Sequence, residues 1–220
     1  MEPMKPSLRG ILAIWNDRRA GTEIEYEAWY RREHLPERLS IPGFRASWRY
    51  RAIEAEPEYF TFYETATPEV LFSDAYVSRV ENPTELTRRI MSGTFTNATR
   101  ALLTRAARWG MLRGAFAVSV RFESKPDDSL ESRLREAASR DDVLSAELWR
   151  VTRPDAPAVL SAEQQLRGPD KSITAAALVE LTTEQEARAA AAALRRLLGA
   201  DPHIGVYQLF CMLDKADLDL

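Results

Sequence analysis

The sequence predicts an α+β protein made of two tandem units, each a four-stranded antiparallel sheet with two helices on one face. Three observations lead to this prediction. Apolar runs of strand length alternate with segments of helical period, and the run that starts at Gly10 recurs at Gly114. The first sheet also carries aromatic side chains on the face that its helices would leave bare. Since an apolar sheet face must be buried, we expect the two sheets to pack together as halves of one barrel.

The first unit opens with a strand, a helix and a hairpin. Residues 8–16, "LRGILAIWN", form a compact apolar run typical of a buried strand. The period then changes to three or four over 22–35, which predicts a helix capped by Thr22. Residues 43–53 alternate in polarity, and the aromatic, threonine-rich residues 58–66 form their hairpin partner. The face of the first hairpin strand that we expect inside the barrel carries Phe44, Ala46, Trp48 and Tyr50.

Two helices and a fourth strand complete the first unit. Thr67–Pro68 is a favourable helix start, because a hydroxyl cap is followed by a proline whose missing N–H is not needed in the first turn. We expect that helix to run to about Val80. Asn82–Pro83 repeats the start for a helix that ends near Gly93. The pattern of 97–110 is ambiguous, and its later part is assigned as a strand because the unit still lacks its last one.

The second unit repeats this order. "GAFAVSVRF" at 114–122 resembles "GILAIWN" at 10–16. Each half then has the order β-α-β-β-α-β of the ferredoxin-like unit, which divides the chain into residues 1–112 and 113–220. The remaining elements expected in the second unit are a helix at 127–140, a strand at 143–153, a proline-bearing loop at 154–171, a strand at 172–181, a helix at 184–198 and a strand at 203–213.

Composition limits the class of protein and its partners. Hydrophobic residues make up 45% of the 220 residues and charged residues 29%, as in ordinary globular proteins. A net charge of −3 and a pI near 5.6 favour neither nucleic acid nor an anionic membrane as a partner. One cysteine, Cys211, excludes an internal disulfide, and no apolar run reaches the roughly 20 residues that cross a bilayer. The N-terminus lacks a secretion signal. We expect a cytoplasmic monomer with an internal pseudo-dimer, or a homodimer.

The stretch "WYRREHLPERLSIPGFRASWRY", followed by "YFTFYET", resembles the dimeric α/β-barrel superfamily, nearest its EthD-like members. The resemblance implies a pseudo-dimeric α/β barrel with a ligand pocket between the sheet and the first helix. The superfamily includes polyketide cyclases, lactone isomerases, small monooxygenases and haem enzymes, and fold alone does not choose among these activities. The second unit has no H-x-P motif, so we expect any site in the first unit and a mainly structural role for the second. The matching positions are Trp29, His34, Pro36, Pro42, Gly43, Phe44, Arg49 and Tyr50.

His34 is the candidate acid or base. On a continuous helix, Tyr30, His34 and Arg38 would share one stripe. Pro36 disfavours helix at the preceding residue, which would place His34 near free carbonyls at a helix end. That location favours an imidazolium, with a raised pKa, that could donate a proton to a carbonyl or enolate oxygen. The structural alternative is that His34 caps the helix end and packs against Trp29.

Strand residues supply the rest of the candidate site. Tyr63 and Glu64 point to opposite faces of their strand, and Trp15 is a candidate wall of the pocket. Arg49 or Glu64 would be a polar contact. The alternative is that these aromatics are core and that Arg49 and Glu64 form a cross-strand pair. The predicted catalytic residues are His34, Tyr63 and Glu64, and the predicted substrate-binding residues are Trp15, Trp29, Tyr30 and Arg49.

Three functions are compatible with these residues. The first is a cofactor-independent cyclase, isomerase, dehydratase or decarboxylase that acts on a small apolar or aromatic carbonyl compound, with no metal. The second is a non-catalytic protein that binds a small ligand or another subunit. The third is a haem enzyme with His34 or His203 as the axial ligand. Two histidines without clustered partners do not indicate a zinc site, and motifs for nucleotide binding or serine hydrolysis are absent from the sequence.

Overall fold

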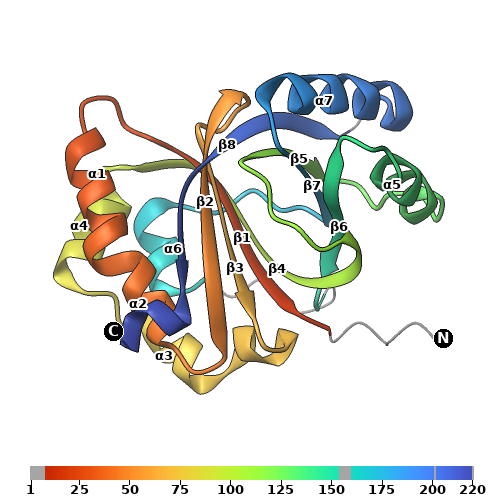
Figure 1. The fold of residues 1–220 in the computed structure, drawn as a ribbon. Coiled ribbons are helices and arrows are strands. Elements are labelled where there is room, and N and C mark those ends of the chain that lie inside the picture. Colours follow the sequence, from red (N-terminus) through yellow and green to blue (C-terminus); the bar gives the residue numbers. More distant parts are fainter. Residues whose placement is uncertain (1–7, 154–159, 201, 220) are drawn as a thin grey trace.

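The computed structural model describes residues 8–153, 160–200 and 202–219, and its eight strands close into one antiparallel barrel (Figure 1). The strand order around the barrel is β1-β3-β2-β8-β5-β7-β6-β4. Closure removes the free edges that an open sheet would expose. The strands are β1 (Gly10–Arg18), β2 (Phe44–Glu54), β3 (Tyr59–Thr65), β4 (Phe95–Gly110), β5 (Phe116–Phe122), β6 (Val143–Val151), β7 (Ala175–Leu181) and β8 (His203–Asp214).

The barrel confirms the predicted arrangement of two ferredoxin-like units. β1 to β4 form one half in the order β4-β1-β3-β2, and β5 to β8 form the other in the order β8-β5-β7-β6. Antiparallel pairing of β2 with β8 and of β4 with β6 joins the two halves. The boundary between 112 and 113 stays a prediction, and the structure places it in the connection from β4 to β5.

Helices cover the outside of the barrel on two sides (Figure 1). α5 and α7 pack on the second half, while α6 comes from the second half of the sequence but contacts α3 and α4 of the first. The expected loop at 154–171 therefore contains a helix. The helical elements are α1 (Glu23–Trp29), a π-helical turn (Tyr30–His34), α2 (Leu35–Ser40), a 3₁₀ turn (Pro68–Phe72), α3 (Asp74–Glu81), α4 (Glu85–Gly93), α5 (Leu130–Ala138), α6 (Ala162–Arg167), α7 (Glu184–Leu198) and a C-terminal 3₁₀ turn (Lys215–Asp219).

All eight strands contribute apolar side chains to the barrel interior. The aromatic face predicted for the first sheet lies there, with the rings of Trp48 and Phe62 stacked at a centroid distance of 4.8 Å. Phe44 is an exception, because a bulge between Phe44 and Ala46 turns it outward into the helix-side core. The indole Nε1 of Trp15 donates to Ser119 Oγ across the barrel at 2.9 Å, so the two halves meet through hydrogen bonding as well as packing.

The recurrence of Gly10 at Gly114 has a structural reason. A Cβ on Gly10 would lie 2.2 Å from Thr65 Oγ1, and a Cβ on Gly114 would lie 2.3 Å from the carbonyl oxygen of Leu181. Each glycine stands at or just before the first strand of its half, where the third strand of that half passes too closely for a side chain.

Of the described helices, none has the length and apolarity to cross a membrane.

Candidate functional site

His34 lies inside a continuous helical segment and not at a helix end. α1 passes through the π-helical turn Tyr30–His34 into α2, and the amide of Leu35 donates to the carbonyl oxygen of Tyr30. The π-helical turn ends at His34, and Pro36 lies in the first turn of α2. The helix therefore accommodates a residue that has no N–H to donate, and it continues to Ser40. The predicted interruption at Pro36 is wrong for this reason. The widened turn still keeps Tyr30, His34 and Arg38 on one side.

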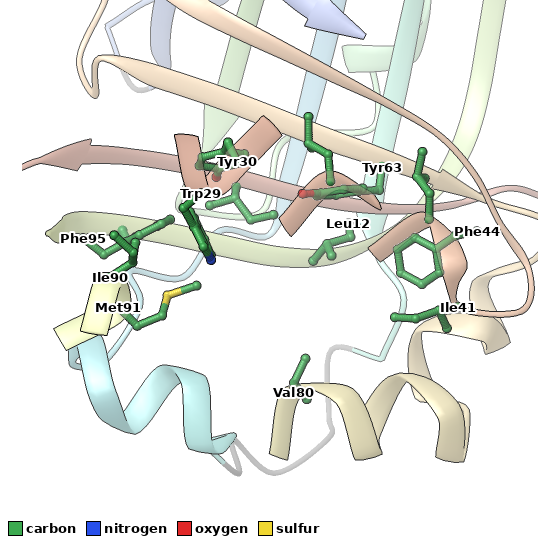
Figure 2. Packing of buried hydrophobic residues seen from close by; sticks show 14 of the residues in the cluster. Leu12, Trp29, Tyr30, Ile41, Phe44, Tyr63, Val80, Ile90, Met91 and Phe95 are labelled. Atoms are coloured by element: carbon green, nitrogen blue, oxygen red, sulfur yellow. The ribbon is translucent and has the colours of Figure 1, made fainter. Parts of the chain in front are cut away.

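These three side chains line a small cavity between the helices and the outer face of the sheet. It leaves about 20 Å³ for the centre of a water-sized sphere, which is room for about one water molecule. Figure 2 shows the surrounding apolar cluster, with Leu12 and Tyr63 on the sheet side and Met91 and Val80 on the helices opposite. The cavity is lined by Leu12, Ile14, Tyr30, His34, Arg38, Tyr76, Met91, Phe95, Arg100, Glu163 and Arg167.

Three arginines give the cavity a positive character. Arg38 forms a buried ion pair with Glu163, and Arg167 pairs with Asp170 at 2.8 Å. Arg100 Nη2 donates to the hydroxyl of Tyr76 at 2.5 Å. Arg38 Nη1, His34 Nδ1 and Tyr63 Oη are buried without hydrogen-bond partners in the described part of the chain. Unpaired buried polar atoms are costly, and two of these three, on Arg38 and His34, belong to residues that line the cavity.

His34 is uncharged at neutral pH. Burial, together with the positive charges of Arg38, Arg167 and Arg49, holds the pKa of His34 well below its ordinary value of 6.5. The sequence-based expectation of a raised pKa and a favoured imidazolium is therefore wrong. Its premise was an exposed helix end, whereas the imidazole is 5% exposed and surrounded by guanidinium groups. A neutral imidazole has one free lone pair and can act as a proton acceptor.

Four other predicted residues lie on the helix side of the sheet with His34. The Trp29 ring packs against the imidazole at a centroid distance of 4.2 Å, and its Nε1 donates to Thr87 Oγ1 at 3.0 Å. The Tyr63 ring lies 6.3 Å from the imidazole. The guanidinium of Arg49 lies 4.0 Å from the centre of the Tyr30 ring. Trp29 and Tyr63 therefore pack against His34, and Arg49 packs against Tyr30.

Arg49 is held by two hydrogen bonds to Glu27, at 2.7 and 2.9 Å. The alternative in which Arg49 pairs with Glu64 is wrong, because the two side chains lie on opposite faces of the sheet. Glu64 faces the barrel interior and pairs with Arg105 at 2.8 Å and Arg9 at 3.5 Å.

Trp15 also lies inside the barrel, away from the His34 cavity. Its ring stacks on Phe60 at 4.8 Å. The prediction that Trp15 and Glu64 lie beside the first helix is wrong, because strand alternation turns both side chains to the opposite face of the sheet. The side chains of β1 and β3 that reach the helices are those one residue away, such as Leu12, Ile14 and Tyr63.

Several cavity residues lay outside the sequence-based site. Glu163 and Arg167 come from α6, within the segment expected to be a loop, and Arg100 comes from β4. The available signal was the spacing of Glu163 and Arg167, which puts both on one side of a helix. Nothing in the sequence indicates that this helix packs on the first half.

The structure leaves no room for a haem group beside His34 as its side chains stand. The cavity at His34 has room for about one water molecule. His203 is exposed, and its Nε2 lies 3.0 Å from Glu123 Oε1. Among the described residues there is also no cluster of three or more histidine, cysteine, aspartate or glutamate side chains suited to a metal ion.

No protein-family model matches the chain, and no curated protein matches it in sequence. Solved structures match its fold over nearly the whole length. An anthrone oxidase-like protein has a TM-score of 0.58 at 9% identity, with 96% of this chain and 94% of that chain covered. The chain has the dimeric α/β-barrel fold.

Two further solved structures match the chain in fold. A Fusobacterium nucleatum protein named "putative monooxygenase" has a TM-score of 0.56 at 9% identity, covering 95% of this chain and 98% of its own. A mutant chlorite dismutase from Candidatus Nitrospira defluvii has a TM-score of 0.50 at 11% identity, covering 98% and 94%. At these identities the similarity establishes the fold and not the reaction. The nearer kinship to EthD-like members stays a prediction.

Proposed function

We propose that this dimeric α/β barrel is a small-molecule enzyme that moves a proton on an apolar or aromatic carbonyl compound, with His34 as the base. The observation that supports this most directly is the buried, uncharged His34, whose Nδ1 has no hydrogen-bond partner in the described structure and which borders a cavity lined by three arginines. A perturbed titratable group with unpaired polar atoms around it is typical of a catalytic site.

The chemistry follows from the charges around the cavity. His34 takes a proton from the carbon next to the substrate carbonyl, and the electron pair of the broken C–H bond becomes the enolate. The unpaired N–H of Arg38 Nη1 would stabilise the enolate oxygen, with Arg100 beside it. The arginines that oppose an imidazolium in the free protein are then offset by the new negative charge. His34 returns the proton to another atom of the substrate, as in an isomerase or cyclase.

The test is deuterium uptake, because it reports proton removal whatever the later steps are. The protein is incubated in D₂O with a panel of enolisable aryl keto acids and keto esters, and mass spectrometry measures exchange above the uncatalysed rate. We expect His34→Gln to lose about 10²-fold or more of the catalysed exchange. His203→Gln is the matched control, since it removes the exposed histidine. A folded His34→Gln protein with wild-type exchange would remove His34 from the mechanism.

The enclosed cavity favours a second candidate, a protein that binds a small ligand without turnover. Its space of about 20 Å³ for the centre of a water-sized sphere does not admit a substrate until side chains move. In this case compounds of the same panel shift the melting temperature, and none of them gains deuterium beyond the uncatalysed rate.

A further inference from the structure

A second hollow adjoins the His34 cavity and is large enough for a ligand. It has a volume of about 470 Å³ and lies between α3, β4 and the start of α6. Ligand pockets of this kind commonly span several hundred Å³ and are mainly apolar. We call it the α3 groove; its apolar wall includes Leu71, Phe72, Val77, Val80, Leu102 and Ile173.

Tyr76 and Arg100 line both the groove and the His34 cavity, so this hydrogen-bonded pair forms the partition between them. α6 borders both spaces as well. Ser161 and Gln164 face the groove, while Glu163 and Arg167 line the cavity. A molecule that lies in the groove therefore reaches the cavity by displacing the hydroxyl of Tyr76 from Arg100.

Arg100 lacks an anionic partner. No carboxylate of the described residues lies within ion-pair distance of its guanidinium, although Asp170 and Glu163 attract it from farther away, and its hydrogen-bond partner is the hydroxyl of Tyr76. Arg38 and Arg167, in contrast, each have a carboxylate. Arg100 is half-buried and lines the groove, so an anionic oxygen delivered by a ligand would give its guanidinium the direct counter-ion that it lacks.

We propose that the ligand of this site is an amphipathic anion whose apolar or aromatic body fills the α3 groove and whose carboxylate or enolate binds Arg100. This proposal rests on the proposed function only for what happens next at His34; binding in the groove is independent of turnover. The volume of about 470 Å³ lies in the range of pockets that hold a drug-sized ligand. A neutral apolar compound of the same size gains the groove contacts but leaves Arg100 unpaired.

The other charges at the groove are consistent with this choice. Glu81 lines it, but its carboxylate accepts the N–H of Ala162 at the start of α6, at 3.2 Å. Arg153 lines it as well, and its guanidinium lies 3.8 Å from the centre of the Phe72 ring. Two arginines and one engaged carboxylate leave the groove attractive to an anion.

Two fluorescent probes of similar shape test the proposal. 8-Anilino-1-naphthalenesulfonate carries a negative charge, and N-phenyl-1-naphthylamine does not. We expect Arg100→Gln to raise the dissociation constant of the anionic probe by at least about tenfold and to leave that of the neutral probe within about twofold. Val77→Glu, which places a carboxylate on the groove wall, should weaken both probes. Ile24→Glu is its control, because Ile24 is exposed on α1 and away from the groove.

The outcomes separate this inference from the proposed function. Equal effects of Arg100→Gln on both probes, or no effect of Val77→Glu on either, would overturn the groove assignment, whatever the deuterium assay shows. Charge-selective binding that depends on Arg100 and Val77 would support it even if His34→Gln retained full exchange. Thermal melts of each variant exclude probe binding to unfolded protein.

Discussion

Lowering the pH should destabilise this protein through His34, by an amount that follows from its burial. The folded state keeps the imidazole neutral with a lowered pKa, whereas in the unfolded chain it titrates near 6.5. The unfolded state therefore binds the proton more readily, and the stability present above pH 6.5 is lost as the pH falls below it. Between about pH 7.5 and pH 5.5 the loss due to this one group is about 1.4 kcal/mol, because a full pKa unit corresponds to about that free energy.

The measurement is urea unfolding at both pH values for the wild type, His34→Gln and His203→Gln. Carboxylates also titrate in this range, so the quantity of interest is a difference between proteins and not an absolute slope. The free energy of unfolding of the wild type should fall by about 1.4 kcal/mol more than that of His34→Gln. His203→Gln keeps His34 and should retain the additional loss.

The sign of this difference decides between two views of the site. If the wild type became more stable relative to His34→Gln at the lower pH, the folded protein would favour the imidazolium. Such a result would refute both the burial-based reasoning and the assignment of His34 as a base. It would restore the interpretation in which His34 lies at an exposed helix end.

Two further predictions concern packing and charge. Glu163→Ala removes the partner of buried Arg38 and should lower the free energy of unfolding by about 3 kcal/mol or more, measured by urea unfolding. A loss below about 1 kcal/mol would mean that this ion pair does not form in solution. Gly10→Ala should lower the free energy of unfolding by about 1–3 kcal/mol, because its Cβ would lie 2.8 Å from the carbonyl oxygen of Thr67. Gly93→Ala is the control, since a Cβ there meets open space and should be neutral or slightly stabilising. Equal melting temperatures for the two variants would contradict the close approach at β1.

Local patterns predicted most of the fold, because they report physical requirements that act within a few residues. Alternation over 43–53 and the aromatic, threonine-rich composition of 58–66 predicted the strands β2 and β3. The recurrence of glycine at 10 and 114 marked the duplication, and the structure shows that a neighbouring strand excludes a side chain at both positions. The bulge at the start of β2, which turned Phe44 to the other face, has no comparable local signal.

The sequence by itself determined that two similar sheets would bury each other's aromatic faces and that His34 belonged to a polar stripe on the first helix. Periodicity and residue type are sufficient for both conclusions. Tertiary structure alone decided the electrostatics of the site. It brought Arg100 from β4 and Glu163 with Arg167 from α6 around an imidazole that the π-helical turn keeps inside the helix. The proton affinity of His34 depends first on burial, and then on the charges of Arg38, Arg167 and Arg49. No local pattern gives the burial of the imidazole or its distance from Arg167 on α6.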